Sequence, residues 1–553
     1  DILFGLGAAT VADSLVIRWP DGKISNHTDL KINDLNIFSQ EEEKTSGNRQ
    51  IAGTEGYFED LTEELKFPFR HTENELIEFG REPFLLRMNS TQGPGMTAGD
   101  VNNDGREDVF IGGCKWNPGE LWLQQADAKF VKAQEELFIK DSLAEDVASL
   151  FLDIDGDGDQ DLLVLPGGNE FSGDHPARRV RLYLNQNGIL SPATTAIFPE
   201  LYITGSAIAA TDMDEDGDID IFLSSRAVPG KYPEKPPHYL LENRSGTFVL
   251  REEAAIDGLN KLTDARWADI NGDGKMDLLV SEDWGQVVVL LQTVNGLEKL
   301  ADPTLEADKG LWNTVYPADI DEDGDMDIIA GNFGLNTKLR ASEEKPVNLR
   351  VCDADNNGYP DMIVTYYFDN QEILFHTRDE LAAKIPAIKK EVVSYKDFST
   401  LEPKMLFEPC WSDEASLASL TELASVVFIN GGSEGFTKKP LPGISQASSV
   451  HDIQLLDINE DGRQDLLLSG NFYENTLQLG RMDANLGCVL LQKDGGEFEA
   501  LPADRLGFVS KGQVREIHQL KVGDRNLWVL AKNNAPFQVL DLAKTNKTTN
   551  ATN

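Results

Sequence analysis

A nine-residue pattern occurs seven times in this chain and constrains its fold more than any other feature. It reads: an acid, any residue, Asp or Asn, any residue, Asp or Asn, glycine, two further residues and Asp. The copies begin at Asp100, Asp153, Asp212, Asp269, Asp319, Asp353 and Asp457. Alternate acids and amides in a short loop supply the oxygen ligands that hard divalent cations prefer, and the glycine permits a sharp turn. The repetition predicts up to seven Ca²⁺ sites.

The predicted ligands are the side chains at positions 1, 3, 5 and 9 of each copy and the backbone carbonyl at position 7. They are Asp100, Asn102, Asp104, Arg106 and Asp108; Asp153, Asp155, Asp157, Asp159 and Asp161; Asp212, Asp214, Asp216, Asp218 and Asp220; Asp269, Asn271, Asp273, Lys275 and Asp277; Asp319, Asp321, Asp323, Asp325 and Asp327; Asp353, Asp355, Asn357, Tyr359 and Asp361; and Asp457, Asn459, Asp461, Arg463 and Asp465. The copy at Asp353 is the weakest match, because Asn357 replaces an acid and Pro360 precedes the last Asp. An ordinary Asp/Gly turn without metal is the alternative for any single copy.

The segments around each copy indicate strands and not helices. Short apolar runs flank the loops, such as Ser206–Ala210 and Ile219–Ser224 around the third copy. An EF-hand differs, because it lies between helices and closes with Glu at position 12. Each copy is therefore predicted to be the turn of a β-hairpin.

The spacing of the copies predicts a β-propeller. Their starts are 53, 59, 57, 50, 34 and 104 residues apart, and a period near 50 to 60 with several short strands is typical of propeller blades. Second hairpins follow most metal hairpins, for example at 182–188 and 426–435, which makes four antiparallel strands per blade. We expect an all-β fold with seven blades. Eight remain the alternative, because Val514–Ala531 resembles a further inner hairpin without its acids.

Three further segments define the expected organisation. Tyr57–Glu63 resembles the outer strand Thr247–Glu252 and is expected to close the ring by joining the last blade. The 34-residue interval suggests that the Asp319 and Asp353 copies share one irregular blade. The long interval after Asp353 is expected to hold a helical insertion at 369–425, with helices over 379–395 and 413–423. Its expected role is a packing appendage, with a lid over the ligand face as the alternative.

The repeats resemble the FG-GAP/VCBS repeats of integrin α-chain propellers and bacterial surface proteins, over roughly 56–542. Residues 1–38 resemble the second half of an ASPIC/UnbV domain, in FGLG at 4–7 and VIRWPDGK at 16–23. Expected domains are thus 1–38, a linker at 39–56, the propeller at 57–543 and a disordered tail at 544–553. The resemblance implies an exported protein at the cell surface or in the extracellular space. The incomplete first domain suggests part of a longer polypeptide.

Composition narrows the classes of partner. The chain has 94 acids against 50 bases, a formal net charge of −44, which disfavours nucleic acids and anionic membranes. No apolar run is long enough for a membrane span.

The four cysteines show no zinc-binding spacing; isolated buried thiols are the preferred interpretation, and one long-range disulfide is the alternative. The GxSxG match at 431–435 is interpreted as a hairpin turn, because the segment after it resembles a returning strand.

The expected ligand face lies opposite the metal turns. Loops that leave the second strands and enter the first strands carry amides, aromatic rings and a few charges, which suit carbohydrate or peptide recognition. The predicted ligand-binding residues are Asn169, Glu170, Arg266, Glu282, Trp284, Trp312, Asn313, Asn332, Asn471 and Tyr473. Phe333 and Phe472 are expected to pack between blades.

These features favour a calcium-stabilised binding or adhesion module for a glycan or protein ligand, without catalytic activity. A polysaccharide-active enzyme that uses the same face is one alternative, and a passive scaffold within a larger surface protein is another. A convergent acid pair or an acid–His pair would favour the enzyme.

Overall fold

The computed structural model describes residues 11–18, 24–28, 30–32, 36–38, 56–355, 357–358, 360–412 and 415–543. Antiparallel strands dominate this part of the chain, and most belong to four-stranded sheets, which confirms the all-β class. Strands β1 (Leu15–Arg18) and β2 (Ile24–His27) form a separate hairpin near the amino terminus. Nearly all of the predicted linker and the whole predicted tail lie outside the described residues.

Seven sheets form a closed ring. The innermost strands β4 (Met96–Gly99), β8 (Asp146–Leu152), β12 (Gly205–Thr211), β16 (Lys261–Ala268), β21 (Thr314–Ala318), β29 (Val450–Leu456) and β33 (Gln513–Val522) contact one another in this order, and β33 contacts β4. The second strands are β5 (Asp108–Ile111), β9 (Asp161–Pro166), β13 (Asp220–Ser225), β17 (Asp277–Gly285), β22 (Asp327–Gly331), β30 (Asp465–Gly470) and β34 (Arg525–Asn533). The protein is therefore a seven-bladed propeller, and the eight-bladed alternative is wrong.

The outer half of each blade is a second hairpin, as expected. The third strands are β6 (Glu120–Gln124), β10 (Arg181–Gln186), β14 (Tyr239–Asn243), β18 (Val287–Thr293), β27 (Val426–Asn430), β31 (Cys488–Lys493) and β35 (Gln538–Leu542). The fourth are β7 (Phe130–Ala133), β11 (Ile189–Pro192), β15 (Phe248–Arg251), β19 (Gly296–Lys299), β28 (Phe436–Pro440), β32 (Glu497–Ala500) and β3 (Phe58–Asp60), and β20 (Gly310–Leu311) adds to blade 4. The pairing of β3 with β35 joins the first strand of the ring to the last, which confirms the predicted closure.

The hydrophobic core is divided into layers between neighbouring blades. One cluster joins blades 3 and 4, with Phe222 and Leu278 fully buried, and another joins blades 6 and 7, with Leu467 and Leu530. Second strands are covered on both faces by adjacent blades, so they are continuous apolar runs such as Leu162–Leu165 and do not alternate. The hydrophobic surface of each blade is therefore buried only when the neighbouring blades are in place.

Short helices and turns connect the strands. They are α1 (Thr62–Leu65), η2 (Glu78–Gly80), α2 (Glu135–Ile139), η3 (Pro176–Arg178), α3 (Ala254–Asp257), α4 (Pro303–Ala307), η5 (Gly432–Glu434), η6 (Gly443–Gln446), η7 (Asp494–Gly496) and α9 (Ala503–Leu506). The η5 turn joins β27 to β28, so the GxSxG match is a hairpin turn, as predicted. No described helix is long and apolar enough to cross a membrane.

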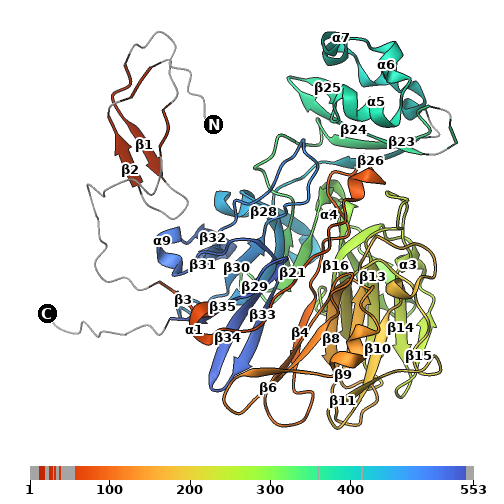
Figure 1. The fold of residues 1–553 in the computed structure, drawn as a ribbon, viewed down its shortest axis with the longest axis vertical. Helices are drawn as coiled ribbons and strands as arrows, with labels where there is room; N and C mark the ends of the chain where they lie inside the picture. The colour runs from red at the N-terminus through yellow and green to blue at the C-terminus, as the bar shows by residue number, and fades with distance from the viewer. Residues whose placement is uncertain are drawn as a thin grey trace.

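An insertion in blade 5 forms a sheet of its own, which stands above the ring in Figure 1. It contains β23 (Val347–Cys352), β24 (Asp361–Phe368), β25 (Gln371–Leu374), β26 (Ser416–Leu420), α5 (Arg378–Lys384), α6 (Ile388–Glu391), α7 (Tyr395–Thr400), α8 (Pro403–Leu406) and η4 (Glu408–Trp411). The Asp353 turn joins β23 to β24, so it does not share a blade with the Asp319 turn. The insertion thus begins before residue 369, and its predicted second helix is wrong because β26 occupies that segment.

A disulfide joins Cys352 to Cys410 within the insertion, with a Cα–Cα distance of 5.1 Å. It links β23 to η4. Cys114 and Cys488 are buried free thiols. The preferred interpretation of four isolated thiols is therefore wrong for one pair and holds for the other two cysteines.

The segment 66–95, here called the strap, crosses one end of the ring. It leads from the outermost strand of blade 7 to the innermost strand of blade 1. Its residues hydrogen-bond to strand ends and loops of several blades: Arg81 to the Asn169 carbonyl, Arg87 to Asp283 of β17, and Leu86 to the Thr476 amide. Residues 84–91 are almost wholly buried. The strap therefore covers the end opposite the metal turns.

Candidate metal turns and central channel

Six of the seven acidic turns are held by the same two backbone hydrogen bonds, from the amides at positions 5 and 6 to the acid at position 1. In the copy at Asp153, the amide of Gly156 replaces that of position 5. In the third copy, the amides of Asp216 and Gly217 donate to the two Asp212 oxygens at 3.1 and 3.0 Å. Gly217 has φ of 94°, a conformation that favours glycine. The acid at position 1 is thereby fixed before any ion binds.

The acid at position 9 is a buried structural residue as well as a predicted ligand. Asp220 accepts the Met213 amide from its own turn at 2.9 Å and the Asn243 amide from the third strand at 2.8 Å. The same two-sided arrangement recurs at Asp108, Asp161, Asp277, Asp327 and Asp465. Burial raises the pKa of Asp220 to about 6, although the two amides lower it, and the Asp214 and Asp216 carboxylates add to the rise.

In four turns the carboxylates at positions 1, 3 and 9 converge, with one oxygen of each within 4.8 Å of the others. These groups are Asp153, Asp155 and Asp161; Asp212, Asp214 and Asp220; Asp319, Asp321 and Asp327; and Asp353, Asp355 and Asp361. The Oδ1 atoms of Asp321 and Asp355 are buried without a hydrogen-bond partner among the described residues. Unpaired carboxylate oxygens in a tight group fit a hard cation. The ligand roles of positions 5 and 7 stay predictions.

A set of amide side chains that the sequence analysis missed connects the turns around the ring. Asn243 in blade 3 donates its Nδ2 to the Ile154 carbonyl, at position 2 of the turn in blade 2, at 3.0 Å. Equivalent bonds, here called amide latches, run from Gln124 to Lys521, Asn185 to Val101, Gln292 to Met213, Asn430 to Ile270 and Gln492 to Ile320. Each latch residue also donates its backbone amide to the position-9 Asp of its own blade.

The amide latches had a signal in the sequence. An Asn or Gln ends a short run in the third strand of six of the seven blades, as in LYLN at 182–185, LLEN at 240–243 and FIN at 428–430. Recurrence of one polar residue in a buried strand indicates a repeated hydrogen-bonding role.

Trp284 and Trp312, predicted to bind a ligand, are core residues. Trp312 is fully buried and packs edge-on against Phe428, with ring centroids 6.0 Å apart. Trp284 is covered by Phe84 and Leu85 of the strap and by the insertion. The prediction for both rings was wrong, because the strap and insertion cover Trp284 and the contact between blades 4 and 5 buries Trp312. Phe333 and Phe472 are also buried, as expected.

Four further predicted ligand residues are buried in structural hydrogen bonds. Asn332 accepts the amides of Leu311 and Phe333 at 3.1 and 2.8 Å, and Glu282 accepts those of Asn260 and Gln286. These two therefore organise loops.

Asn169 donates to Glu82 of the strap at 3.2 Å, and Asn471 donates to the Asn485 carbonyl at 2.7 Å. Both are buried. Neither presents its side chain to solvent, so their prediction as ligand residues was wrong.

Glu170 and Tyr473 are partly exposed but already paired. Glu170 accepts Asn74 Nδ2 of the strap at 2.8 Å, and the Arg481 guanidinium lies 3.8 Å from the centre of the Tyr473 ring. Of the ten predicted residues, only Arg266 and Asn313 line the central channel.

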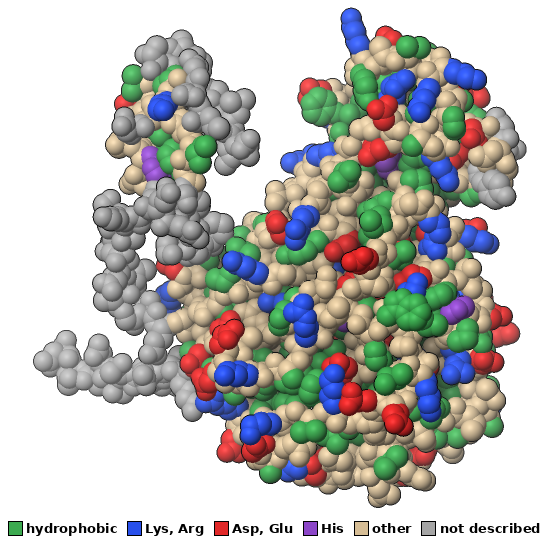
Figure 2. Space-filling model, in the orientation of Figure 1, with side chains coloured by type: hydrophobic (Ala, Val, Ile, Leu, Met, Phe, Trp, Pro, Cys, Tyr) green, Lys and Arg blue, Asp and Glu red, His purple; other side chains and the backbone are tan. Residues whose placement is uncertain are grey.

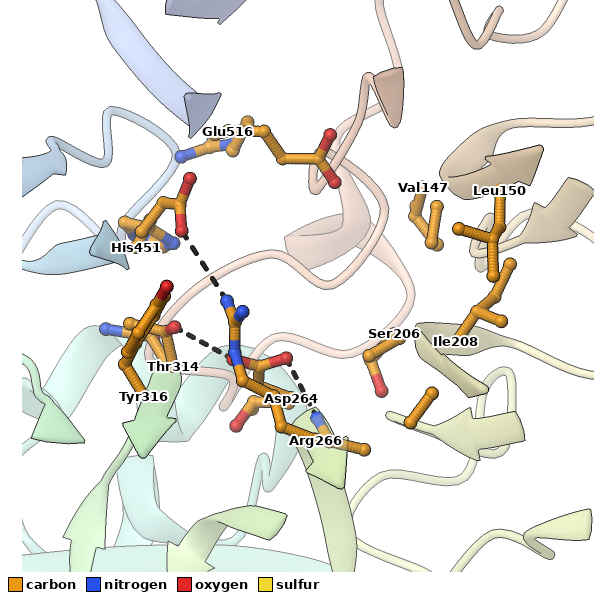
Figure 3. A pocket seen from close by; sticks show the side chains of 18 of the residues that line it. Val147, Leu150, Ser206, Ile208, Asp264, Arg266, Thr314, Tyr316, His451 and Glu516 are labelled. Carbon is orange, nitrogen blue, oxygen red and sulfur yellow. Dashed lines mark hydrogen bonds and ion pairs between the residues drawn. The ribbon is translucent and has the colours of Figure 1, made fainter. Parts of the chain in front are cut away.

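The central channel is a cavity of about 590 Å³ lined by the inner strands of all seven blades. Figure 3 shows its two unlike walls. Val147, Leu150 and Ile208, from blades 2 and 3, form an apolar side. Charged side chains from blades 4, 6 and 7, among them Arg266 and Glu516, face the cavity from the other side.

β-Bulges place several of these side chains. The register of the inner pair shifts in five blades, at Val147, at 206–207, and at Thr263, His451 and Arg515. A bulge inserts one extra residue and redirects its side chain. All of these residues line the cavity, at matching levels of their strands.

The charged wall is a connected network. Arg266 lies 3.6 Å from Asp264 and 3.8 Å from Asp452, and its guanidinium covers the Tyr316 ring at 4.7 Å. The Thr314 hydroxyl donates to Asp264 at 2.8 Å. Burial raises the pKa of Asp452 to about 6, against the lowering effect of Arg266.

The two ends of the channel differ in access. Gln519 and Met276 line the end near the metal turns and are exposed, whereas Arg226, Asn313 and Arg515 at the other end are buried. Arg515 donates to the Thr91 carbonyl of the strap at 3.0 Å. The channel is therefore closed by the strap and opens among the metal turns, opposite to the expected ligand face.

Comparison with known families supports the repeat architecture. Residues 100–164, 153–223 and 269–330 match the family described as FG-GAP-like repeat. Residues 1–45 match the family described as ASPIC and UnbV. The chain thus carries FG-GAP-like repeats behind an ASPIC/UnbV segment, as the resemblance indicated. No curated protein matches the chain in sequence.

Solved structures with a similar arrangement include BBS1N in complex with ARL6DN, at 9% identity and a TM-score of 0.39, covering 89% of this chain and 98% of that chain. Another is Saccharomyces cerevisiae Sqt1, at 11% identity and 0.37, covering 83% and 98%. A third is the extracellular domain of the putative hybrid two component system BT3049 from B. thetaiotaomicron, at 10% identity and 0.37, covering 82% and 40%.

The burial of Trp312 gives a stability prediction. Trp312→Ala removes a large side chain from the layer between blades 4 and 5 and should lower the free energy of unfolding by about 3–5 kcal/mol. Denaturant unfolding measures the change. Trp116→Ala is the matched control, because Trp116 is 70% exposed, and its unfolding should change little. Equal losses in the two variants would contradict the assignment of Trp312 to the core.

The amide latches give a second prediction. Asn243→Ala leaves the backbone amide on Asp220 but removes the bond to the preceding turn and leaves the Ile154 carbonyl unpaired. The free energy of unfolding should fall by about 1–3 kcal/mol. Amide hydrogen exchange should become faster in the turns of both blades. Asn295→Ala, on an exposed turn, is the control. Exchange that rises only in blade 3 would show that the latch does not couple the blades.

Proposed function

We propose that this β-propeller is a calcium-stabilised, exported binding module that admits a glycan or protein ligand through the channel end surrounded by its metal turns. The observation that carries the proposal is the position of these turns. Six of them directly follow the inner strands that line the channel, so bound ions would shape its open end.

Calcium is the ion that the turns suit best. Their donors are carboxylate and amide oxygens without thiolate or imidazole, which are preferences of hard cations. Three carboxylates within 4.8 Å repel one another until a cation neutralises them. Binding would therefore be coupled to the stability of the ring.

Two features support a location outside the cytoplasm. The disulfide between Cys352 and Cys410 is typical of oxidising compartments. FG-GAP repeats, which this chain carries, are typical of extracellular proteins.

On the face drawn in Figure 2, acidic and basic side chains are interspersed without a continuous basic patch, which agrees with a partner other than nucleic acid.

The channel suits a ligand with both polar and apolar parts. A cavity of about 590 Å³ has the size of a small-molecule site and would take a terminal group of a glycan or a few residues of a peptide. The polar wall around Arg266 and Asp452 would orient that group, and the wall around Val147 and Ile208 would accept its apolar side.

One observation favours the enzyme alternative. His518 and Glu516 project from the same strand into the channel and form an acid–His pair, with Nε2 and Oε2 3.0 Å apart. Burial lowers the pKa of His518, but the hydrogen bond to Glu516 and the charges of Glu516 and Asp452 raise it above its usual value. A protonated imidazole beside a carboxylate is a proton donor. The non-enzymatic proposal is kept because Glu516 also accepts the Met96 amide at 2.8 Å, a structural role.

The first prediction concerns calcium. Removal of the ion should lower the melting temperature by many degrees, because each saturated site adds about 2.7 kcal/mol when free calcium is 100 times its Kd. Asp321→Asn should lose about that stabilisation in excess calcium. In chelator it should be at least as stable as the unchanged protein, because burial and the Asp323 and Asp319 carboxylates raise the pKa of Asp321.

Asp325→Asn is the matched control, since it removes the same charge from the same turn at a position predicted to bind only through its carbonyl. The melting temperature of this variant should respond to calcium as that of the unchanged protein does. A melt that is unchanged in chelator after verified metal removal would contradict the calcium proposal.

The second prediction concerns the channel. Arrays of glycans and extracellular proteins, probed with calcium-saturated protein, should give a ligand whose capture weakens by about 10-fold or more in Arg266→Ala. Arg244→Ala, in the outer turn between β14 and β15 with a 61% exposed side chain, should bind normally. The melting temperatures of both variants are measured as well, so that a loss of binding caused by unfolding can be distinguished from a loss of affinity.

Capture that is unaffected in Arg266→Ala would place the ligand outside the channel. Turnover of the captured ligand that disappears in His518→Gln, with folding retained, would replace the binding module by the enzyme.

A further inference from the structure

The closed end of the channel contains a buried arginine without a partner. Arg226 follows β13 directly and is only 6% exposed, yet it lines the cavity. Its Nε has no hydrogen-bond partner, and no carboxylate lies within ion-pair distance of its guanidinium among the described residues. Buried arginines are normally paired, because an uncompensated buried charge is costly.

Other cationic and donor groups surround the same end. Arg515, with its side chain 3% exposed, donates to the carbonyls of Asn471 and Thr91 at 3.0 Å each, while its Nε stays without a partner. Asn313 accepts from Arg87 at 2.6 Å, and its Nδ2 is unpartnered. His451 stacks on Phe472. Three unsatisfied N–H groups therefore come from Arg226, Arg515 and Asn313.

The acids nearby do not balance the charge of Arg226. Asp283 is already bonded to Arg87 at 2.7 Å and to the Tyr232 hydroxyl at 2.6 Å. Glu474 approaches Arg515 only to 4.0 Å. Burial lowers the pKa of Arg226 to about 10, and the neighbouring Arg87 and Arg515 charges lower it further, against the opposing effect of Asp283. Around Arg226, two arginines therefore act against one carboxylate, whereas Glu73 and Glu145 act on Arg515.

We propose that the closed end of the channel is a binding site for an aliphatic carboxylate, held by Arg226 with Arg515 and Asn313. A planar carboxylate matches the guanidinium fork and can accept two parallel N–H bonds. The same cavity presents Val147 and Ala148 from blade 2 and Ala207 from blade 3, which suit a hydrocarbon skeleton better than a hydroxylated sugar. The carboxylate would enter from the open end as the leading group of a ligand. This inference rests on the proposed function and specifies its ligand.

The test titrates calcium-saturated protein with butyrate, butyramide, glucuronate and inorganic sulfate at constant ionic strength, with calorimetry and melting temperature as readouts. Butyrate should bind saturably and raise the melting temperature, whereas neutral butyramide should not. In Arg226→Met the Kd for butyrate should rise about 10-fold or more. The ligand-free variant should melt at or above the unchanged protein, since an unpaired buried charge is gone. Arg525→Met, with its side chain half exposed in blade 7, should respond like the unchanged protein.

Three outcomes would overturn the proposal. The first is equal binding of butyrate and butyramide, or of butyrate by Arg226→Met and the unchanged protein. The second is a response to sulfate without one to butyrate, which would assign the site to an inorganic oxyanion. The third is tighter binding of glucuronate than of butyrate, which would assign a sugar acid. Because these probes are small molecules, their result is separate from whether an array yields a macromolecular ligand.

Discussion

The arrangement of the ring depends on one interaction, the buried aspartate that closes each acidic turn. Asp220 and its equivalents bind an amide of their own turn and an amide of the third strand, so a single carboxylate joins both hairpins of a blade. The residue that supplies the second amide is also the latch to the preceding blade. Local turn chemistry, blade geometry and the contact between blades therefore share one group. Loss of charge at that carboxylate would disturb all three.

The repeated parts of this fold were predictable because their signals are local. The acid and glycine positions specify each hairpin turn, and the segment at 57–63 shows the pattern of an outer strand. Six of the seven inner hairpins and the closure by β3 follow from these signals, whereas the inner hairpin of blade 7, β33 and β34, has no acidic turn. The convergence of positions 1, 3 and 9 also follows from the turn pattern.

The non-repeated parts were not predictable in the same way. Turn chemistry does not say which sheet a hairpin joins, so the Asp353 copy looked like part of blade 5 although it lies in the insertion. Trp284 and Trp312 stand at strand ends, where rings are often exposed. Their burial depends on the strap and on contacts between blades, which involve residues far away in sequence and show no periodicity. Arg226 carries no motif, and only the three-dimensional structure shows that it lacks a partner.

The path of the strap has a mechanical consequence. The chain runs from β3, at the outer rim of blade 7, across the closed end of the channel to β4, at the inner rim of blade 1. Tension applied through the amino-terminal segment would load the contact of Tyr57 with Arg505 and the short pairing of β3 with β35 before it reached the strap. Once that pairing separated, the same pull would act on the strap. A pulling force along the polypeptide would thus first separate β3 from β35 and then move the strap away from the closed end of the channel.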